Sequence, residues 1–268
     1  MKTLYNILKQ HILYFSQIRK LARIDLSKTY KGASLGWLWA ILRPSITIFV
    51  YWFAISIGLR AGKPVGQYPF FLWLIAGFIP WFYMSDVIKS GMESMSKYSY
   101  LVTKLKFPIS TIPTFINISR LYVHCIMVVI LIIVFWAFGY PPDIYLLQLP
   151  IYIILMFTLF ALWSLFSSCL AVLSKDFAHF VKSMITPLLW LSGVLWNPNT
   201  ITIPWVQKFL LVNPITYITN GFRNVFIYKI NFFDQANRLL YFEIGMVILL
   251  VLALWVYKKT HKEIPDVL

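Results

Sequence analysis

Charged side chains interrupt the long apolar runs of this 268-residue sequence at few positions. Arg43, Asp86, Arg120 and Asp176 lie within such runs or at their ends. Ionisable residues inside apolar segments are costly, so they are candidates for function. A guanidinium binds phosphate through two parallel hydrogen bonds, and Arg43 and Arg120 are therefore candidates for an anionic cargo. The alternative is that these side chains snorkel to an interface or pair structurally.

Motifs for catalysis or metal binding are sparse. The sequence has no GxxxxGK[ST] loop for ATP, no HExxH, no CxxC and no paired carboxylates. The four histidines are far apart, and Cys125 and Cys169 each sit in an apolar run as small hydrophobic residues. We therefore expect this chain to bind no metal or cofactor. A membrane-embedded transferase stays as the alternative of another class, with Asp176 and His179 as its weak acid–base pair.

The composition identifies an integral membrane protein. Apolar residues make up 60% of the chain and charged residues 12%, against about 45–50% and about 25% in soluble domains. Disordered, collagen-like and disulfide-rich classes are excluded by the high hydrophobicity, the 11 glycines and the two cysteines. The net charge of +15 is explained by loops that face an anionic leaflet, and nucleic acid is not an expected partner.

Apolar runs long enough to cross a bilayer predict an all-α integral membrane fold with six transmembrane helices per protomer. A hydrocarbon core of about 30 Å needs about 20 residues of helix. Apart from Arg43 and Arg120, the predicted topology puts sixteen Lys and Arg on one side and six on the other. Positive charge favours the cytoplasm, so both termini are expected there. The six predicted spans are 37–59, 65–88, 121–138, 146–173, 177–196 and 241–257.

The N-terminal segment 1–32 is predicted to be an amphipathic helix in the membrane interface. Its apolar residues, among them Leu4 and Leu8, recur at helical spacing with basic and polar residues on the other faces. A helix of this kind contacts a cytoplasmic subunit or only anchors the chain.

The loop 89–107 is predicted to form a short cytoplasmic helix with one apolar edge. An apolar edge rimmed by charge is typical of a contact site, although such a helix can also rest on the membrane. The apolar members are Met92, Met95, Tyr98, Leu101 and Leu105, and the basic members are Lys97, Lys104 and Lys106.

The connection 197–238 is predicted to face outward as two short amphipathic helices that re-enter the membrane. Prolines at 198, 204 and 214 divide it into apolar pieces of about ten residues, too short to cross. The alternative is a seventh and an eighth span.

Aromatic side chains are abundant, at 18% of the chain. Most are expected to form interfacial belts or to pack between helices. Clusters such as Trp37 and Trp39 could also line a path on which sugar rings stack.

Three segments in a fixed order resemble a known family. They are the run 30–39, YKGASLGWLW, which leads to Arg43 and Pro44; the loop 101–108, LVTKLKFP; and the run 212–217, VNPITY, followed by Arg223. Together they resemble the permease subunits of type 2 ABC exporters of the polysaccharide-export group, across nearly the whole chain. YPFFLWLIAGFIPWFYMSD and KLKFPISTIP are most similar to wall teichoic acid exporters. Thr29 departs from the family, in which Arg is frequent at that position.

The resemblance implies a homodimer in the cell (plasma or inner) membrane with two copies of a separate ATPase subunit that binds ATP and Mg. The cargo would be an anionic glycan polymer, wall teichoic acid, on a polyprenyl diphosphate. An O-antigen or capsule exporter and a drug exporter are the alternatives. Leu4, Leu8 and the loop residues named above would contact the ATPase. A substrate path would be lined by Arg43, Arg120, Trp37, Trp39, Asp86 and Asp176. The outer exit would be formed by Asn213, Pro214, Tyr217 and Arg223.

Overall fold

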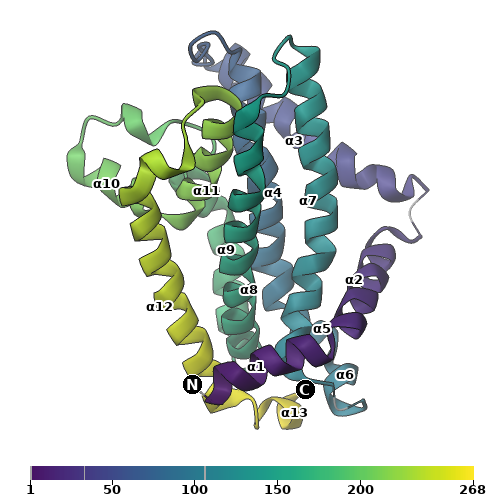
Figure 1. Ribbon diagram of the computed structural model, residues 1–268. Helices are drawn as coiled ribbons and strands as arrows, with labels where there is room; N and C mark the ends of the chain where they lie inside the picture. The colour runs from purple at the N-terminus through teal and green to yellow at the C-terminus, as the bar shows by residue number, and fades with distance from the viewer. Residues whose placement is uncertain (1, 33, 106) are drawn as a thin grey trace.

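The computed structural model describes residues 2–32, 34–105 and 107–268, and this part of the chain is all-helical (Figure 1). The all-α prediction is confirmed. The α-helices are α1 (Lys2–Leu13), α2 (Phe15–Tyr30), α3 (Trp39–Phe53), α4 (Phe70–Met92), α5 (Ser94–Lys97), α6 (Ser99–Thr103), α7 (Ile112–Ala137), α8 (Leu149–Leu173), α9 (Lys175–Leu191), α10 (Pro204–Val212), α11 (Pro214–Arg223), α12 (Ala236–Thr260) and α13 (Ile264–Val267).

Five helical segments are long and apolar enough to cross a membrane. Four of them include a short helical turn before or after the α-helix. They are Gly36–Gly58, Phe70–Met92, Ile109–Ala137, Ile144–Leu173 and Phe232–Thr260. The chain is therefore a multi-pass membrane protein.

Helix α4 is the core of the bundle. In its most apolar window 78% of the residues are buried, against 11% for the span that contains α3. It packs against α3, α7, α8, α9 and α11. A helix that is apolar on all sides can be buried on all sides, as the sequence of α4 requires.

The fifth predicted span, 177–196, corresponds to α9, which has only 17 residues. At 1.5 Å per residue it is about 26 Å long, short of the roughly 30 Å hydrocarbon core. Helix α9 starts at the end of the bundle where α8 finishes, and the chain then reaches the opposite end, where α12 begins (Figure 1). Both chain ends lie at one end of the bundle, and a sixth crossing stays a prediction.

Several predicted span limits are wrong by a few residues to about nine. Val65 and Tyr68 form a tight turn, and α4 begins only after Pro69. Helix α7 starts at Ile112, so Arg120 lies well inside it. Helix α12 begins at Ala236, and Arg238 therefore belongs to it rather than to the connection 197–238.

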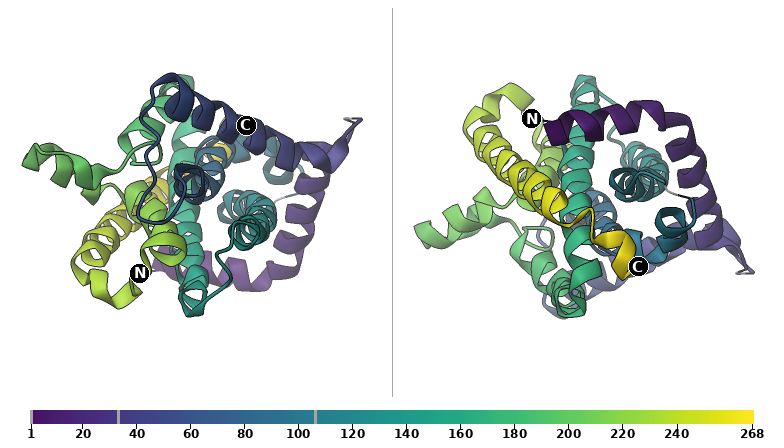
Figure 2. Two further views of the ribbon diagram at one scale, coloured as in Figure 1. Left: turned by 90° about the horizontal axis from the view of Figure 1, so that it is seen from above. Right: turned by 90° about the horizontal axis from the view of Figure 1, so that it is seen from below.

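The amphipathic N-terminal segment forms two helices, α1 and α2. They wrap around one end of α7, as the view from below shows (Figure 2). Leu4 is half-buried and Leu8 is exposed, and both line an apolar groove of about 230 Å³ with α8 and α12. These two side chains face the flank of the spans, which favours the anchoring alternative over an ATPase contact for them.

The segment after α4 folds as two short helices, α5 and α6, but its apolar edge faces the protein. Met92, Met95, Tyr98 and Leu101 are at most 3% exposed. The prediction that these four side chains form an exposed docking edge is therefore wrong, because they pack on the described helices of the same chain. The exposed side of the segment carries Lys97, Tyr100, Lys104 and Leu105, and Lys106 lies outside the described residues.

The connection 197–238 contains the two short helices that its prolines predict. Pro204 and Pro214 are the first residues of α10 and α11, where a missing N–H costs nothing. Asn213 caps α11, because its Oδ1 accepts a hydrogen bond from the N–H of Ile215 at 2.9 Å. All residues of α11 after Pro214 are buried, against α4, α8 and α12. Re-entry into the membrane stays a prediction.

Arg223, predicted at the outer exit, is buried in the protein. Its guanidinium lies over the ring of Trp73, 3.4 Å from the centroid. Nη1 donates to the carbonyl of Gly193 at 2.6 Å and Nη2 to that of Val194 at 2.7 Å. Since Arg223 is 0% exposed, it ties α11 to α4 and to the turn after α9, and its assignment as an exit-lining residue is wrong.

We expect Arg223→Ala to destabilise the protein by about 3 kcal/mol, because it leaves two buried carbonyls without a donor. Gly77→Ala is expected to act in the same direction, since its Cβ would collide with Nη2 of Arg223. Thermal unfolding of the purified protein in detergent measures the effect. Arg238→Ala is the matched control, because Arg238 is half-buried and, among the described residues, hydrogen-bonds only to Asn199. Equal melting temperatures for all variants would contradict the assignment.

Candidate functional site

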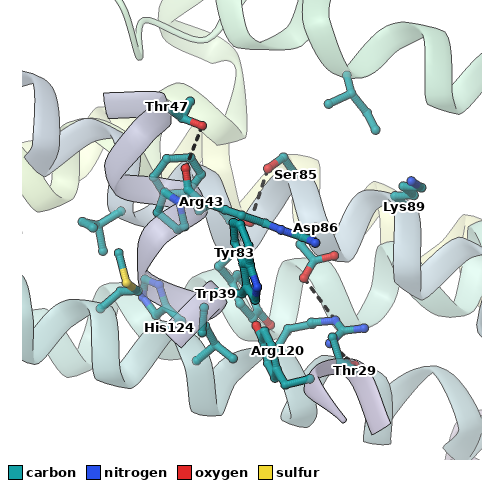
Figure 3. A pocket seen from close by; sticks show the side chains of 18 residues that line it. Thr29, Trp39, Arg43, Thr47, Tyr83, Ser85, Asp86, Lys89, Arg120 and His124 are labelled. Atoms are coloured by element: carbon teal, nitrogen blue, oxygen red, sulfur yellow. Dashed lines mark hydrogen bonds and ion pairs between the residues drawn. The ribbon is translucent and has the colours of Figure 1, made fainter. Parts of the chain in front are cut away.

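A polar cavity of about 450 Å³ lies between α2, α3, α4 and α7 (Figure 3). It brings together four of the six residues predicted for the substrate path. Its polar and aromatic lining consists of Thr29, Tyr30, Trp39, Arg43, Thr47, Phe82, Tyr83, Ser85, Asp86, Lys89, Arg120 and His124.

Helical periodicity aligns the residues that line the cavity. Trp39, Arg43 and Thr47 are spaced by four on α3 and face the same side. On α4, Phe82, Asp86 and Lys89 are spaced by four and three, and they form the facing wall. The cavity therefore depends on the packing of α3 on α4.

Arg120 is fixed by partners on two other helices. Its Nε lies 3.1 Å from Oδ2 of Asp86 on α4, and its Nη2 lies 3.6 Å from Oδ2 of Asp25 on α2. Nη1 donates to the hydroxyl of Thr29 at 3.2 Å. Arg120 is only 8% exposed, so the structure pairs this cation before any ligand arrives.

Asp25, which no sequence signal singled out, is a fully buried carboxylate on α2. Lys97, Tyr98 and Ser119 donate hydrogen bonds to it at 2.6–2.8 Å. Burial by itself would raise the pKa of Asp25, but these hydrogen bonds and the charge of Arg120 together hold it below the ordinary value. Its contribution to stability is present at neutral pH and is lost as the pH falls through that lowered pKa.

Arg43 and Lys89 are the available cations of the cavity. Both are exposed, and among the described residues neither forms an ion pair. The guanidinium of Arg43 lies 5.6 Å from the ring centroid of Trp39. With Arg120 neutralised by carboxylates, these two side chains give the cavity its capacity to bind an anion.

His124 adds a polar group at the wall of the cavity. It is 3% exposed, and within the described part of the chain neither ring nitrogen has a hydrogen-bond partner. Its ring packs on Tyr83 and Phe222, with centroids 5.4 and 5.7 Å apart. An unpaired imidazole at this position can hydrogen-bond a ligand or a water.

Sequence reasoning missed Lys89 as a site residue because the predicted span ended at Ile88. The available signal was the continuation of helical spacing from Phe82 through Asp86 to Lys89. Asp25 had no comparable signal, and Thr29 stood out only as a departure from the family, because Arg120, which contacts both residues, lies far away in the sequence.

Trp37 and Asp176, two predicted path residues, lie outside the cavity. Trp37 is 47% exposed and stacks on Tyr30 with centroids 5.0 Å apart. Asp176 is exposed in the first turn of α9, where a negative charge favours the helix dipole. In the protomer they do not share the cavity of Arg43 and Arg120, and their place in a substrate path stays a prediction.

The residues predicted for the outer exit do not line one opening. Asn213 and Pro214 border an apolar groove of about 340 Å³ between α8, α9, α11 and α12. Tyr217 is 5% exposed, and its ring lies 4.8 Å from that of Phe242 on α12. Only the first two residues are therefore positioned to contact a molecule in a groove.

No group of three or more His, Cys, Asp and Glu side chains within the described ranges is arranged to hold a metal ion. The helices, the cavity and the spans define a membrane-embedded transport subunit. Residues 16–227 match the ABC-2 type transporter family, so the chain belongs to this family. Its members are transmembrane subunits that work with a separate ATPase subunit.

Characterised relatives extend over most of the chain. An O-antigen export system permease protein from Myxococcus xanthus is 23% identical over 80% of this chain and 81% of its own length. A protein with the same name from Klebsiella pneumoniae is 25% identical over 91% of this chain and 92% of its own length.

We expect the two carboxylates that contact Arg120 to differ in their effect on stability. Asp25→Asn should destabilise the protein by about 3 kcal/mol, because Asp25 is fully buried and its loss leaves Arg120 without one partner. Asp86→Asn should cost less than about 1 kcal/mol, since the side chain of Asp86 is 52% exposed. Chemical unfolding in detergent compares the two. A larger effect for Asp86→Asn would contradict the assignment of Asp25 as the structural partner.

Proposed function

We propose that this chain is the permease of an ATP-driven exporter that moves a glycan polymer on a polyprenyl diphosphate out of the cytoplasm. It works as a homodimer with two copies of the separate ATPase subunit, which binds ATP and Mg. The six-span topology with both termini in the cytoplasm, and the re-entrant placement of α10 and α11, belong to this proposal.

The observation that carries the proposal is the cavity with two available cations beside an aromatic ring. Arg43 and Lys89 supply the charge, and Trp39 supplies a flat face. A diphosphate attached to a sugar presents the matching groups, since phosphate binds guanidinium and ammonium groups and sugar rings stack on indole.

An O-antigen-type polysaccharide is the better supported cargo. The relatives described above are O-antigen permeases, whereas wall teichoic acid rests on the resemblance of two sequence segments. The basic character of the cavity suits the diphosphate of either carrier. We therefore propose a polysaccharide as the cargo, with wall teichoic acid as the second candidate.

The exposed side of α5 and α6 is the proposed contact with the ATPase. Tyr100 is 41% and Leu105 65% exposed, and Lys104 lies between them in the sequence. An exposed apolar pair with a neighbouring charge is typical of a protein interface. This patch keeps Leu105 from the apolar edge that the sequence predicted, whose other four members are buried.

The second protomer is proposed to pack on the span that contains α3. This span is the least buried of the five, and it carries exposed Phe49, Phe53 and Ile57. Because α3 also carries Arg43 and Trp39, a movement of this helix in the dimer would open or close the cavity.

Replacing the available cations tests the headgroup site. We expect Arg43→Gln and Lys89→Gln each to weaken binding of a polyprenyl diphosphate by about ten-fold, since each removes one charge-assisted hydrogen bond. Binding of a fluorescent polyprenyl diphosphate to the purified protein in nanodiscs measures this. Lys175→Gln is the matched control, because Lys175 is exposed and lies outside the cavity. Unchanged affinity in both variants would exclude the cavity as the site.

Co-purification tests the contact with the ATPase and the function as a whole. We expect the tagged chain to retain an ATPase subunit at about one to one, and Leu105→Glu to reduce that retention by about ten-fold, the effect of losing one important interface residue. Mass spectrometry of complexes isolated from the native membrane gives the ratio. Lys175→Glu is the control. If the unaltered chain is isolated without an ATPase, the exporter proposal fails and the transferase alternative returns.

A further inference from the structure

The two oxygens of the Asp25 carboxylate bind different parts of the protein. Oδ1 accepts hydrogen bonds from Lys97 at 2.8 Å and from Tyr98 at 2.6 Å, both in the segment formed by α5 and α6. Oδ2 accepts one from Ser119 at 2.7 Å and lies 3.6 Å from Nη2 of Arg120, both on α7. One carboxylate therefore joins the α5–α6 segment to α7.

The contacts of Oδ1 of Asp25 extend to the protein surface. The side chain of Lys97 is 47% exposed, whereas that of Asp25 is 0% exposed. Lys97 belongs to the segment whose outer side carries Tyr100 and Leu105, the proposed ATPase contact. A displacement of this segment would act directly on Oδ1.

The contacts of Oδ2 of Asp25 extend to the cavity. Arg120, its partner, also pairs with Asp86 through Nε at 3.1 Å, and both residues line the cavity. Ser119 is 0% exposed and precedes Arg120 on α7. The route from the α5–α6 segment to the cavity wall therefore consists of consecutive polar contacts of 2.6–3.6 Å.

We propose that Asp25 is a positioning residue that transmits movement of the α5–α6 segment to Arg120 and so to the headgroup cavity. This inference rests on the proposed function, because it requires the ATPase to act on that segment. Asp25 itself contacts neither the cargo nor the ATPase.

The physical basis is the rigidity of a buried carboxylate. Its two oxygens share one sp² carbon that fixes their plane and the angle between them, so a shift of one oxygen moves the other. Water is excluded at Asp25, and a hydrogen bond lost there is not replaced by solvent. The α5–α6 segment and Arg120 are thus coupled by polar contacts that break only at substantial cost.

The test compares the ATP-dependent accessibility of the cavity in intact complexes. Ser85 lines the cavity and is replaced by Cys, with Cys125→Ala to remove the exposed native thiol; Cys169 is buried. A charged methanethiosulfonate is added to the complex with its ATPase in nanodiscs, without nucleotide or with ATP and vanadate. We expect the modification rates to differ by at least about five-fold between the two states, the lower end of typical allosteric coupling.

Two sets of variants remove contacts of the Asp25 carboxylate, which joins the α5–α6 segment to α7. Asp25→Asn removes the charge without changing the shape. Tyr98→Phe combined with Ser119→Ala removes one hydrogen bond from each oxygen and keeps the carboxylate, which provides a folded alternative. We expect the rate ratio to fall to within about two-fold in both sets, while ATPase retention and the basal rate of ATP hydrolysis stay unchanged. Tyr241→Phe is the matched control and should keep the full ratio, because Tyr241 is 45% exposed on α12, outside the α5–α6 segment and the cavity.

A full rate ratio in the Tyr98→Phe/Ser119→Ala variant overturns the inference, even if that variant melts at a lower temperature, because Asp25 would then only hold the helices together. Failure of the unaltered chain to retain an ATPase overturns the proposed function and this inference with it. The two failures are distinguishable because the second is visible before any variant is made.

Discussion

The guanidinium of Arg120 lies between two carboxylates, and the arrangement of three helices depends on that pairing. Asp25 belongs to α2, Asp86 to α4 and Arg120 to α7. A buried cation needs partners, so these helices cannot separate without leaving a charge unpaired in an apolar surrounding. The cavity wall and the packing of the interface helix α2 are thus fixed by one set of contacts.

Burial separates the arginines into two kinds. Arg120 and Arg223 are at most 8% exposed and are saturated by partners within the protein, so their main contribution is to hold helices together. Arg43 is exposed beside Trp39, and its donors are open to an incoming anion. Arg120 and Arg223 therefore stabilise the packing of the helices, whereas the guanidinium of Arg43 is free to bind a ligand.

The general organisation of the fold was predictable because it depends on local sequence. Long apolar runs gave five of the spans, and prolines marked the starts of α10 and α11. The limits of the helices were less predictable. Helix α4 runs on past Ile88 to Met92, and its Ser90 accepts a hydrogen bond from Arg120. Helix α7 starts nine residues before the predicted span, because Asn117, Ser119 and Arg120 find partners inside the bundle. A hydropathy profile records that a residue is polar, but it does not show which partner in the folded protein satisfies the hydrogen bonds of that residue.

The sequence by itself determined that this is a helical membrane protein with a basic face. It also identified Arg43, Trp39, Asp86 and Arg120 as site candidates. These conclusions follow from residue types and spacing within single helices. Only the tertiary structure decided which of these candidates meet. It placed Asp176 and Trp37 elsewhere, buried Arg223, turned the apolar edge of the α5–α6 segment inward, and brought Asp25 to Lys97, 72 positions along the chain. Such contacts depend on how helices pack, and packing joins residues whose separation in sequence carries no periodic signal.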